Sequence, residues 1–248
     1  HLHGGTRLPV VKDVAFTVSG GECVVLGGPS GAGKSSVLKM IYGNYLANAG
    51  QIHISHEGQL IDIVAADPAT VLDIRRKTMG YVSQFLRVIP RVSALEIVAE
   101  PARAAGFSPD DAHMRAAGLL TRLNLPERLW KLPPATFSGG EQQRVNIARG
   151  FAGTHRLMIL DEPTAALGVK QSGMVLRYIT AAKEQGFGVI FITHNPHHAH
   201  MVGDHFVLLN RGRQKLDCTY DEITLEHLTQ EMAGGNDLEA LAHELGRK

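Results

Sequence analysis

A glycine-rich octapeptide near the start of the chain constrains its fold more than any other feature of the sequence. Residues 28–35 read GPSGAGKS and match the pattern G-x-x-x-x-G-K-[ST] in full. The short apolar run at residues 22–28 is typical of a buried strand. Apolar residues at helical spacing follow the loop: Val37, Leu38, Ile41 and Tyr42. Strand, glycine loop and helix in this order predict a hollow of backbone N–H groups that binds phosphate oxygens.

The residue types in this loop have distinct expected roles. Glycines let the backbone approach a nucleotide closely, and the lysine places a positive charge near the β- and γ-phosphates. The serine after the lysine supplies a hydroxyl ligand for Mg²⁺. A strand-to-helix turn that merely favours glycine is the alternative, and the flanking pattern disfavours it. We predict that ATP and Mg²⁺ bind here, with Lys34 catalytic, Ser35 on the metal, and nucleotide contacts from Gly28, Pro29, Ser30, Gly31, Ala32, Gly33, Lys34, Ser35 and Ser36.

Polar residues end two further apolar runs. The run at residues 156–160 leads into Asp161 and Glu162, and the run at residues 188–193 leads into His194. Such runs, separated by helical stretches, predict a parallel α/β sheet, in which ligands bind at the carboxyl ends of the strands. We therefore predict that Asp161 holds the Mg²⁺ shell and that Glu162 orients and deprotonates the attacking water. Solvated acids in an ordinary strand-end turn are the alternative interpretation.

The pattern along the chain predicts three parts. Residues 1–92 and 153–217 are expected to form the α/β core, with another strand at residues 205–209 and an antiparallel hairpin from residue 51 to residue 60. Residues 93–152 contain only helical signals, such as the cap, proline and acids of SPDD at residues 108–111, and predict an inserted helical subdomain. Residues 218–248 are expected to form a helical tail that packs on the core through Leu225, Leu228, Met232, Leu238, Leu241 and Leu245.

Composition excludes several classes of protein. Of 248 residues, 44% are hydrophobic and 20% charged, as in ordinary globular proteins, and the formal net charge is +1. Without a basic field, no nucleic-acid partner is expected. No apolar run approaches the roughly 18 residues that span a bilayer, so we expect a cytoplasmic chain that reaches the inner membrane only through a partner. Cys23 and Cys218 are too few for a disulfide framework and indicate a reducing compartment.

The segment FSGGEQQR at residues 137–144 predicts a second anion-binding helix terminus. Ser138 and Glu141 have the spacing of a capping box, and the two glycines between them expose backbone N–H groups in the first turn. A well-capped helix without a ligand is the alternative. One chain would thus carry two phosphate sites, and they lie in different parts of the sequence.

FSGGEQQR resembles the signature of ABC ATPases, LSGGQ in its common form, with phenylalanine and glutamate at the two departures. The resemblance covers roughly residues 2–215 and implies a P-loop NTPase (RecA-like) core with a hairpin region and an inserted helical subdomain. It implies a homodimer, or a heterodimer with another ABC ATPase, in which Ser138, Gly139 and Gly140 contact the partner's nucleotide. By the same resemblance Gln84 touches Mg²⁺ and a coupled partner, and His194 senses the γ-phosphate.

Two further positions depart from that family. Residues 165–168 occupy its D-loop, where Gly168 replaces the usual aspartate. The family stacks adenine on an aromatic residue before the phosphate loop, and none precedes Phe16 here. A zinc site is the alternative for His194, His197, His198 and His200, and we disfavour it because His194 is assigned to phosphate sensing.

The resemblance divides at the shared stretch LDEPTA. Residues 8–164, including QFLRVIPR and PATFSGGEQQRVNIARGF, resemble the L-type ABC subunit of the bacterial phosphonate carbon–phosphorus lyase system. Residues 165–248 resemble ATPases of carbohydrate ABC importers, so a natural divergent member, a recombinant and a designed chimera are the open alternatives. We favour phosphonate lyase subunits as partners, because the partner-selecting regions lie in the first part. A membrane permease is the alternative partner, and a nucleotide-gated scaffold with negligible turnover is a third hypothesis.

Overall fold

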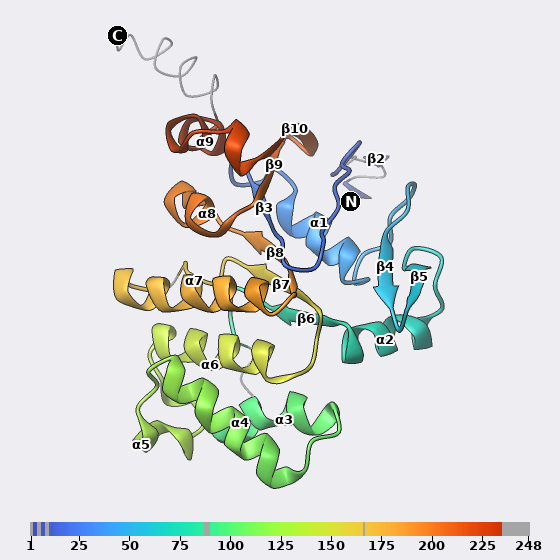
Figure 1. Cartoon of the computed structure of the whole chain (residues 1–248). Helices are drawn as coiled ribbons and strands as arrows, with labels where there is room; N and C mark the ends of the chain where they lie inside the picture. Colours follow the sequence, from blue (N-terminus) through green and yellow to red (C-terminus); the bar gives the residue numbers. More distant parts are fainter. Residues whose placement is uncertain (1, 4–5, 8–9, 87–89, 166, 235–248) are drawn as a thin grey trace.

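A six-stranded sheet forms the centre of the protein, with the strand order β10-β9-β3-β8-β7-β6 in the computed structural model (Figure 1). The structure describes residues 2–3, 6–7, 10–86, 90–165 and 167–234. Neighbouring strands are parallel except for β10, which pairs antiparallel with β9. The strands are β3 Cys23–Gly27, β6 Met79–Val82, β7 Leu157–Asp161, β8 Gly188–Ile192, β9 His205–Asn210 and β10 Arg213–Thr219. The four strands predicted from apolar runs are all present, and the parallel α/β sheet is confirmed.

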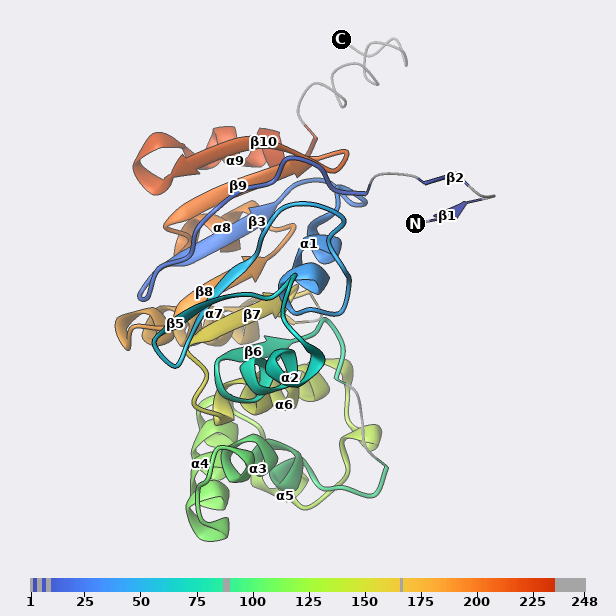
Figure 2. The same ribbon diagram turned by 90° about the vertical axis from the view of Figure 1, so that its right-hand side faces the viewer.

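Both faces of the sheet are buried, because successive side chains of each strand point to opposite sides. On one face Val24 and Leu26 pack with residues of α1 (Lys34–Ile41) and α2 (Pro68–Lys77). On the other face Cys23 joins a second core cluster with residues of α7 (Val169–Glu184) and α8 (Pro196–Val202). Figure 2 shows these two layers in front of and behind the sheet. Burial on both sides explains why the central strands read as continuous apolar runs.

Short antiparallel strands lie beside this sheet. The hairpin of β4 (His53–His56) and β5 (Gln59–Asp62) confirms the one expected near residues 51–60. Ile54 and His56 are its buried side chains, and Ile54 packs in the same cluster as residues of α1 and α2. Two strands of two residues each, β1 (Leu2–His3) and β2 (Thr6–Arg7), pair near the N-terminus.

The stretch between β6 and β7 is helical, as the sequence predicts. It contains α3 Ala94–Ala104, α4 Pro109–Arg122, α5 Glu127–Trp130, the 3-10 helix η1 Pro134–Thr136 and α6 Gly139–Ala152. Helices α3, α4 and α6 pack on one another, and α6 also contacts β6. Ser108 caps α4, and Ser138 forms the predicted capping box with Glu141 at the start of α6. These helices lie within residues 93–152, and the division of the chain into domains at those bounds stays a prediction.

The C-terminal segment packs on the core. Strand β10 continues to Thr219, so the expected tail starts two residues too early, at residue 218. The 3-10 helix η2 (Tyr220–Glu222) and α9 (Leu225–Met232) follow. Leu228 and Met232 are buried in the core cluster, as expected for this helix. Other residues of the predicted tail lie outside the described residues: Leu238, Leu241 and Leu245.

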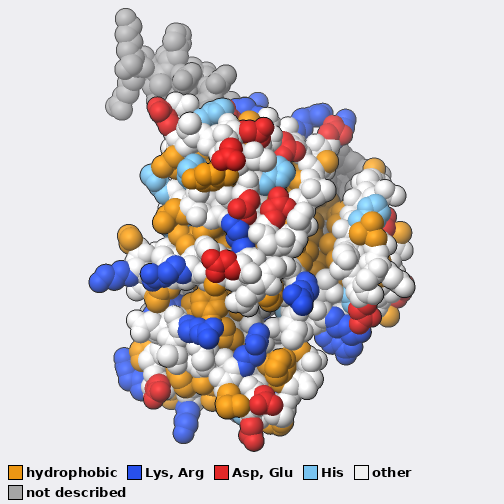
Figure 3. All heavy atoms as spheres, viewed as in Figure 1, with side chains coloured by type: hydrophobic (Ala, Val, Ile, Leu, Met, Phe, Trp, Pro, Cys, Tyr) orange, Lys and Arg blue, Asp and Glu red, His pale blue; other side chains and the backbone are white. Residues whose placement is uncertain are grey.

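The surface carries charges of both signs. On the face shown in Figure 3, acidic and histidine side chains gather mainly near α8 and α9, whereas Lys and Arg gather mainly over the helices below them. Over the described part of the chain, no helix combines the length and the apolar character needed to cross a membrane.

Replacement of Leu228 by Ala tests the packing of α9. Leu228 is 0% exposed, so its truncation leaves a cavity and should lower the free energy of unfolding by about 2–5 kcal/mol in urea denaturation. The matched control is Met201→Ala on α8, which is 70% exposed and should change that free energy by no more than about 0.5 kcal/mol. Equal stability of the two variants would contradict the packing described for α9.

Candidate functional site

The glycine loop connects β3 to α1, and two of its glycines combine a left-handed backbone with close neighbours. Gly28 and Gly33 have φ angles of 124° and 104°. A Cβ atom at Gly28 would lie 2.1 Å from the carbonyl oxygen of Leu209, and one at Gly33 would lie 3.1 Å from the Val11 side chain. Any other residue would therefore displace backbone at Gly28 and be strained at Gly33. The sequence fixes the loop shape through these two positions.

Lys34 is the cationic side chain of the loop, and loop carbonyl groups hold it in place. Its side chain is buried, and its Nζ atom donates to the carbonyl oxygens of Gly28 at 2.7 Å and Pro29 at 2.9 Å. Burial lowers the pKa of Lys34, and the carboxylates of Glu162 and Asp161 oppose that shift. An ammonium group has three hydrogens, and described residues accept two of them, so one is left for a phosphate oxygen.

The other residues of the loop differ in exposure. Ser30, Gly31 and Ser35 are exposed, whereas Ala32 is buried and Ser36 is half-buried. Ser35 lies in the first turn of α1, where its hydroxyl is open to solvent and to a ligand. Hydroxyl, carboxylate and amide oxygens are the donors that Mg²⁺ prefers, so Ser35, Asp161 and Gln84 fit that ion as a set.

Asp161 ends β7, beside the strand that carries Tyr81. The Tyr81 hydroxyl donates to Asp161 Oδ2 at 3.0 Å. Burial raises the pKa of the Asp161 carboxyl, and the Tyr81 hydrogen bond and the charges of Lys39 and Lys34 oppose the shift. A nearby cation would stabilise the ionised form of this carboxyl group and offset the cost of its burial. Tyr81 is not among the predicted site residues, because no pattern in the sequence connects it with Asp161.

Glu162 and His194 come together although 32 residues separate them. His194 Nδ1 lies 2.8 Å from Glu162 Oε2. Parallel pairing of Asp161 with Ile192 in β7 and β8 brings the two strand ends side by side. Glu162 has a φ angle of 50°, a conformation uncommon for residues other than glycine, and its N–H donates to the Ile192 carbonyl oxygen at 3.1 Å. The geometry therefore pairs the predicted base with the predicted phosphate sensor.

The remaining histidines of this region have other contacts. His198 Nδ1 lies 3.1 Å from the Thr164 hydroxyl, and burial lowers the pKa of His198. The His200 ring lies against those of Phe206 and Tyr220, with centroids 6.4 Å and 4.7 Å away. His198 thus has a hydrogen-bond partner and His200 packs among aromatic rings.

The signature segment lies in the helical layer. Ser138 and Gly139 are exposed at the start of α6, and Gly140 is half-buried. The phosphate loop follows β3, and α6 contacts β6, which is three places away from β3 in the sheet order. The two predicted phosphate sites of one chain are thus on different parts of the molecule, with strands between them.

Gln84 is exposed just after β6, and the D-loop lies before α7. Phe85, beside Gln84, is 71% exposed. Gly168 precedes α7 as its cap residue, and Val169, at the start of the helix, is 91% exposed. Of the D-loop segment at residues 165–168, only residue 166 lies outside the described residues.

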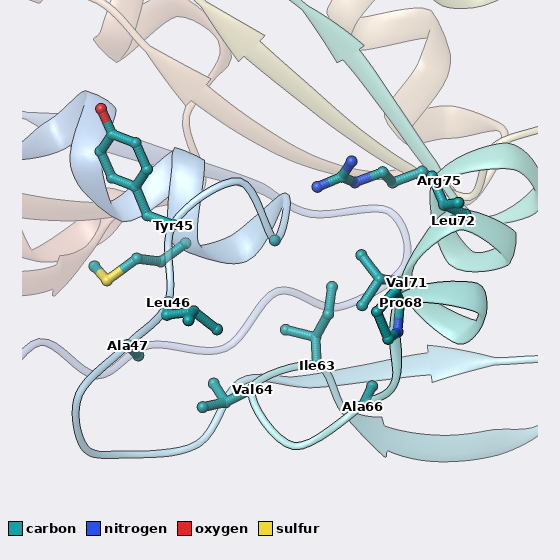
Figure 4. A pocket seen from close by; sticks show the side chains of 12 residues that line it. Tyr45, Leu46, Ala47, Ile63, Val64, Ala66, Pro68, Val71, Leu72 and Arg75 are labelled. Carbon is teal, nitrogen blue, oxygen red and sulfur yellow. The ribbon is translucent and has the colours of Figure 1, made fainter.

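A separate apolar groove of about 320 Å³ lies between the end of α1, the β5–α2 connection and α2 (Figure 4). Leu46 and Leu72 line it and are 86% and 61% exposed. None of the predicted nucleotide-site residues lines this groove. No pattern in the sequence predicts this groove.

Fold and site together define a nucleotide-binding cassette, and the comparison with protein families agrees. The sequence model of the ABC transporter family matches residues 11–165, more than half of the chain, so the protein belongs to that family. It is an ATP-binding subunit of the ABC type and an ATP hydrolase.

Solved structures support the same assignment. The chain is similar to the ATP-binding cassette MJ0796 in a dimeric, post-hydrolysis state bound to ADP and Pi, with a TM-score of 0.81 and 29% identity. The match covers 89% of this chain and 94% of that one. It is also similar to an ATP-binding subunit of an ABC transporter, with a TM-score of 0.75, 32% identity and coverage of 96% and 93%.

Curated relatives include exporters and lipoprotein-releasing systems. The chain is 40% identical over 210 residues to the lipoprotein-releasing system ATP-binding protein LolD 2 of Caulobacter vibrioides, covering 84% of this chain and 90% of the relative. It is 39% identical over 193 residues to the macrolide export ATP-binding/permease protein MacB of Marinobacter nauticus. That match covers 78% of this chain but spans only 29% of the relative. These names refer to neither phosphonate nor carbohydrate, so both assignments stay predictions.

Asp161→Asn tests the electrostatic description of the site. Because burial raises the folded-state pKa of Asp161, ionisation destabilises the ligand-free fold, and the cost appears as pH rises through the folded-state pKa. The variant should therefore melt at a higher temperature than the parent near pH 8, with the difference vanishing at acidic pH below about 4. Thermal melts across this range measure it. A parent that melts at the same temperature as the variant at every pH would contradict the raised pKa.

Proposed function

We propose that two copies of this chain, or one copy and another ABC ATPase, bind two MgATP molecules between each phosphate loop and the opposing signature. The observation that carries this proposal is the separation of the two anion sites on one chain. Since strands β8, β7 and β6 lie between them, the signature of a chain cannot cover its own phosphate loop. The dimeric structure of the similar cassette MJ0796 gives further support.

Hydrolysis in the proposed dimer uses groups already positioned by the chain. Glu162 accepts a proton from the attacking water, while His194, bonded to Glu162, orients that carboxylate and contacts the γ-phosphate. Lys34 and the loop N–H groups stabilise the charge that develops on the transferred phosphoryl. Ser35, Asp161 and Gln84 would hold Mg²⁺, which when bound neutralises charge on the β- and γ-phosphates.

Glu162→Gln tests the assignment of the base. Glutamine keeps the shape of the side chain and can still accept from His194, but it cannot take a proton from water. Hydrolysis should fall at least about a hundredfold, while ATP produces a dimer that persists in size-exclusion chromatography. The control, Glu184→Gln at the exposed end of α7, should hydrolyse ATP like the parent. Parental turnover in the Glu162 variant would remove Glu162 from its proposed role.

The assembly that this ATPase serves is the finer part of the proposal. The resemblance of residues 8–164 to the phosphonate carbon–phosphorus lyase subunit supports lyase subunits as partners. The relatives MacB and LolD support the alternative of a membrane permease in an export or release system. Either partner needs an apolar contact surface, and Phe85 next to Gln84 offers one, as do Leu46 and Leu72 in the groove.

Affinity capture of the chain from its native cells separates the two assemblies. Membranes are first solubilised in mild detergent, and the captured proteins are identified by mass spectrometry. If carbon–phosphorus lyase subunits are also captured when no detergent is used, the result supports the phosphonate assembly. A permease released only by detergent supports the export alternative. A Phe85→Ser variant should lose whichever partner is captured, because this side chain is exposed beside Gln84.

A further inference from the structure

Two buried amide side chains lie one turn apart on α6, the helix that begins at the signature. Gln143 is 2% exposed and Asn146 is 5% exposed. The Gln143 amide donates to the carbonyl oxygen of Pro163 at 3.2 Å. The Asn146 amide donates to the carbonyl oxygen of Ser83 at 2.6 Å and lies 3.4 Å from Gln143 Oε1. Each amide thus joins α6 to a different segment of the chain.

Both acceptor residues are neighbours of groups proposed to act on ATP. Pro163 directly follows Glu162, and Ser83 directly precedes Gln84. The hydrogen-bonded register of β6 and β7 ends at the pair of Val82 with Leu160, so the Ser83 and Pro163 carbonyls lie beyond that ladder. The α6 amides supply donors where the sheet no longer does. The backbone beside each group is therefore held by the helix that carries the signature.

We propose that Gln143 and Asn146 form a positioning pair that links the signature to Gln84 and Glu162. The inference rests on the proposed roles of those two residues and adds a physical connection between them. Nucleotide binding at the N-terminus of α6 shifts this helix. The backbone beside Gln84 and Glu162 then moves with α6, because the two amides are hydrogen-bonded to it. Hydrolysis then depends on the placement of the signature helix, although neither amide contacts a reacting atom.

A simpler explanation is that buried carbonyl groups need donors for stability alone. That explanation predicts a loss of stability on substitution and no specific connection to Gln84. The positioning role predicts a loss of turnover that disappears when Gln84 is already absent. The two explanations therefore differ in kinetics.

Asn146→Leu removes both amide contacts while keeping the branching and the number of side-chain heavy atoms. We expect its kcat for MgATP to fall at least about tenfold, since small misplacements of reacting groups cost this much or more. Its affinity for MgADP in calorimetry should stay within about twofold, because the phosphate loop is not touched. Arg149→Leu on the same helix is the control. Its guanidinium lies 3.7 Å from the Glu100 carboxylate, outside the signature segment, and its kcat should stay within about twofold.

A double-mutant cycle with Gln84→Ala decides between the two explanations. If Asn146 acts through Gln84, the double variant should have a kcat within about twofold of the slower single variant. If the fold-losses in kcat of the two single variants multiply in the double variant, the positioning role is wrong. If Gln84→Ala alone keeps the parental kcat, both the proposed role of Gln84 and the pair's action through it are wrong. Should Asn146→Leu fail to fold, Asn146→Ala enters the same cycle with the same criteria.

Discussion

The parallel pairing of β3, β8 and β7 is the constraint on which the rest of the structure depends. It aligns the carboxyl ends of strands that are far apart in sequence and places the polar residues after each strand at one edge. Asp161 ends one strand of this group, and Lys34, Glu162 and His194 follow its strands. Both faces of the sheet are buried, so polar side chains placed there would lose their hydration at a cost in free energy.

Electrostatics at this edge are prepared for a charged ligand. Lys34 and Asp161 are both partly buried, and burial disfavours the charged form of each, lowering the pKa of the lysine and raising that of the aspartate. Their charges favour one another, and hydrogen bonds from Tyr81 and to the loop carbonyls hold both side chains in place. A triphosphate with a divalent cation would supply the missing countercharges. Such tension between burial and charge is common at catalytic sites.

The helical layer adds what the sheet edge lacks. Its helix α6 begins at the predicted second anion site and carries two buried amides along its length. Those amides donate hydrogen bonds to the backbone beside the predicted base and the predicted metal-contacting glutamine. The helical layer and the sheet therefore share polar as well as apolar contacts. The family of the chain is shown by sequence and structure, whereas the assembly that the chain serves belongs to the proposal.

Local patterns in the sequence determined much of this description. The glycine loop, the capping box of Ser138 and Glu141 and the four apolar strands are short-range features, because backbone conformation and two-sided burial dictate residue type at each position. Strands β6 and β10 were not predicted, because β6 has only four residues, one of them glycine, and β10 is a mostly polar strand at the edge of the sheet without a buried residue. Only the tertiary structure decided that Tyr81 meets Asp161, that His194 meets Glu162 and that Asn146 reaches Ser83. Those contacts join residues 32 to 80 positions apart, and strand register and helix packing, which no local pattern encodes, bring them together.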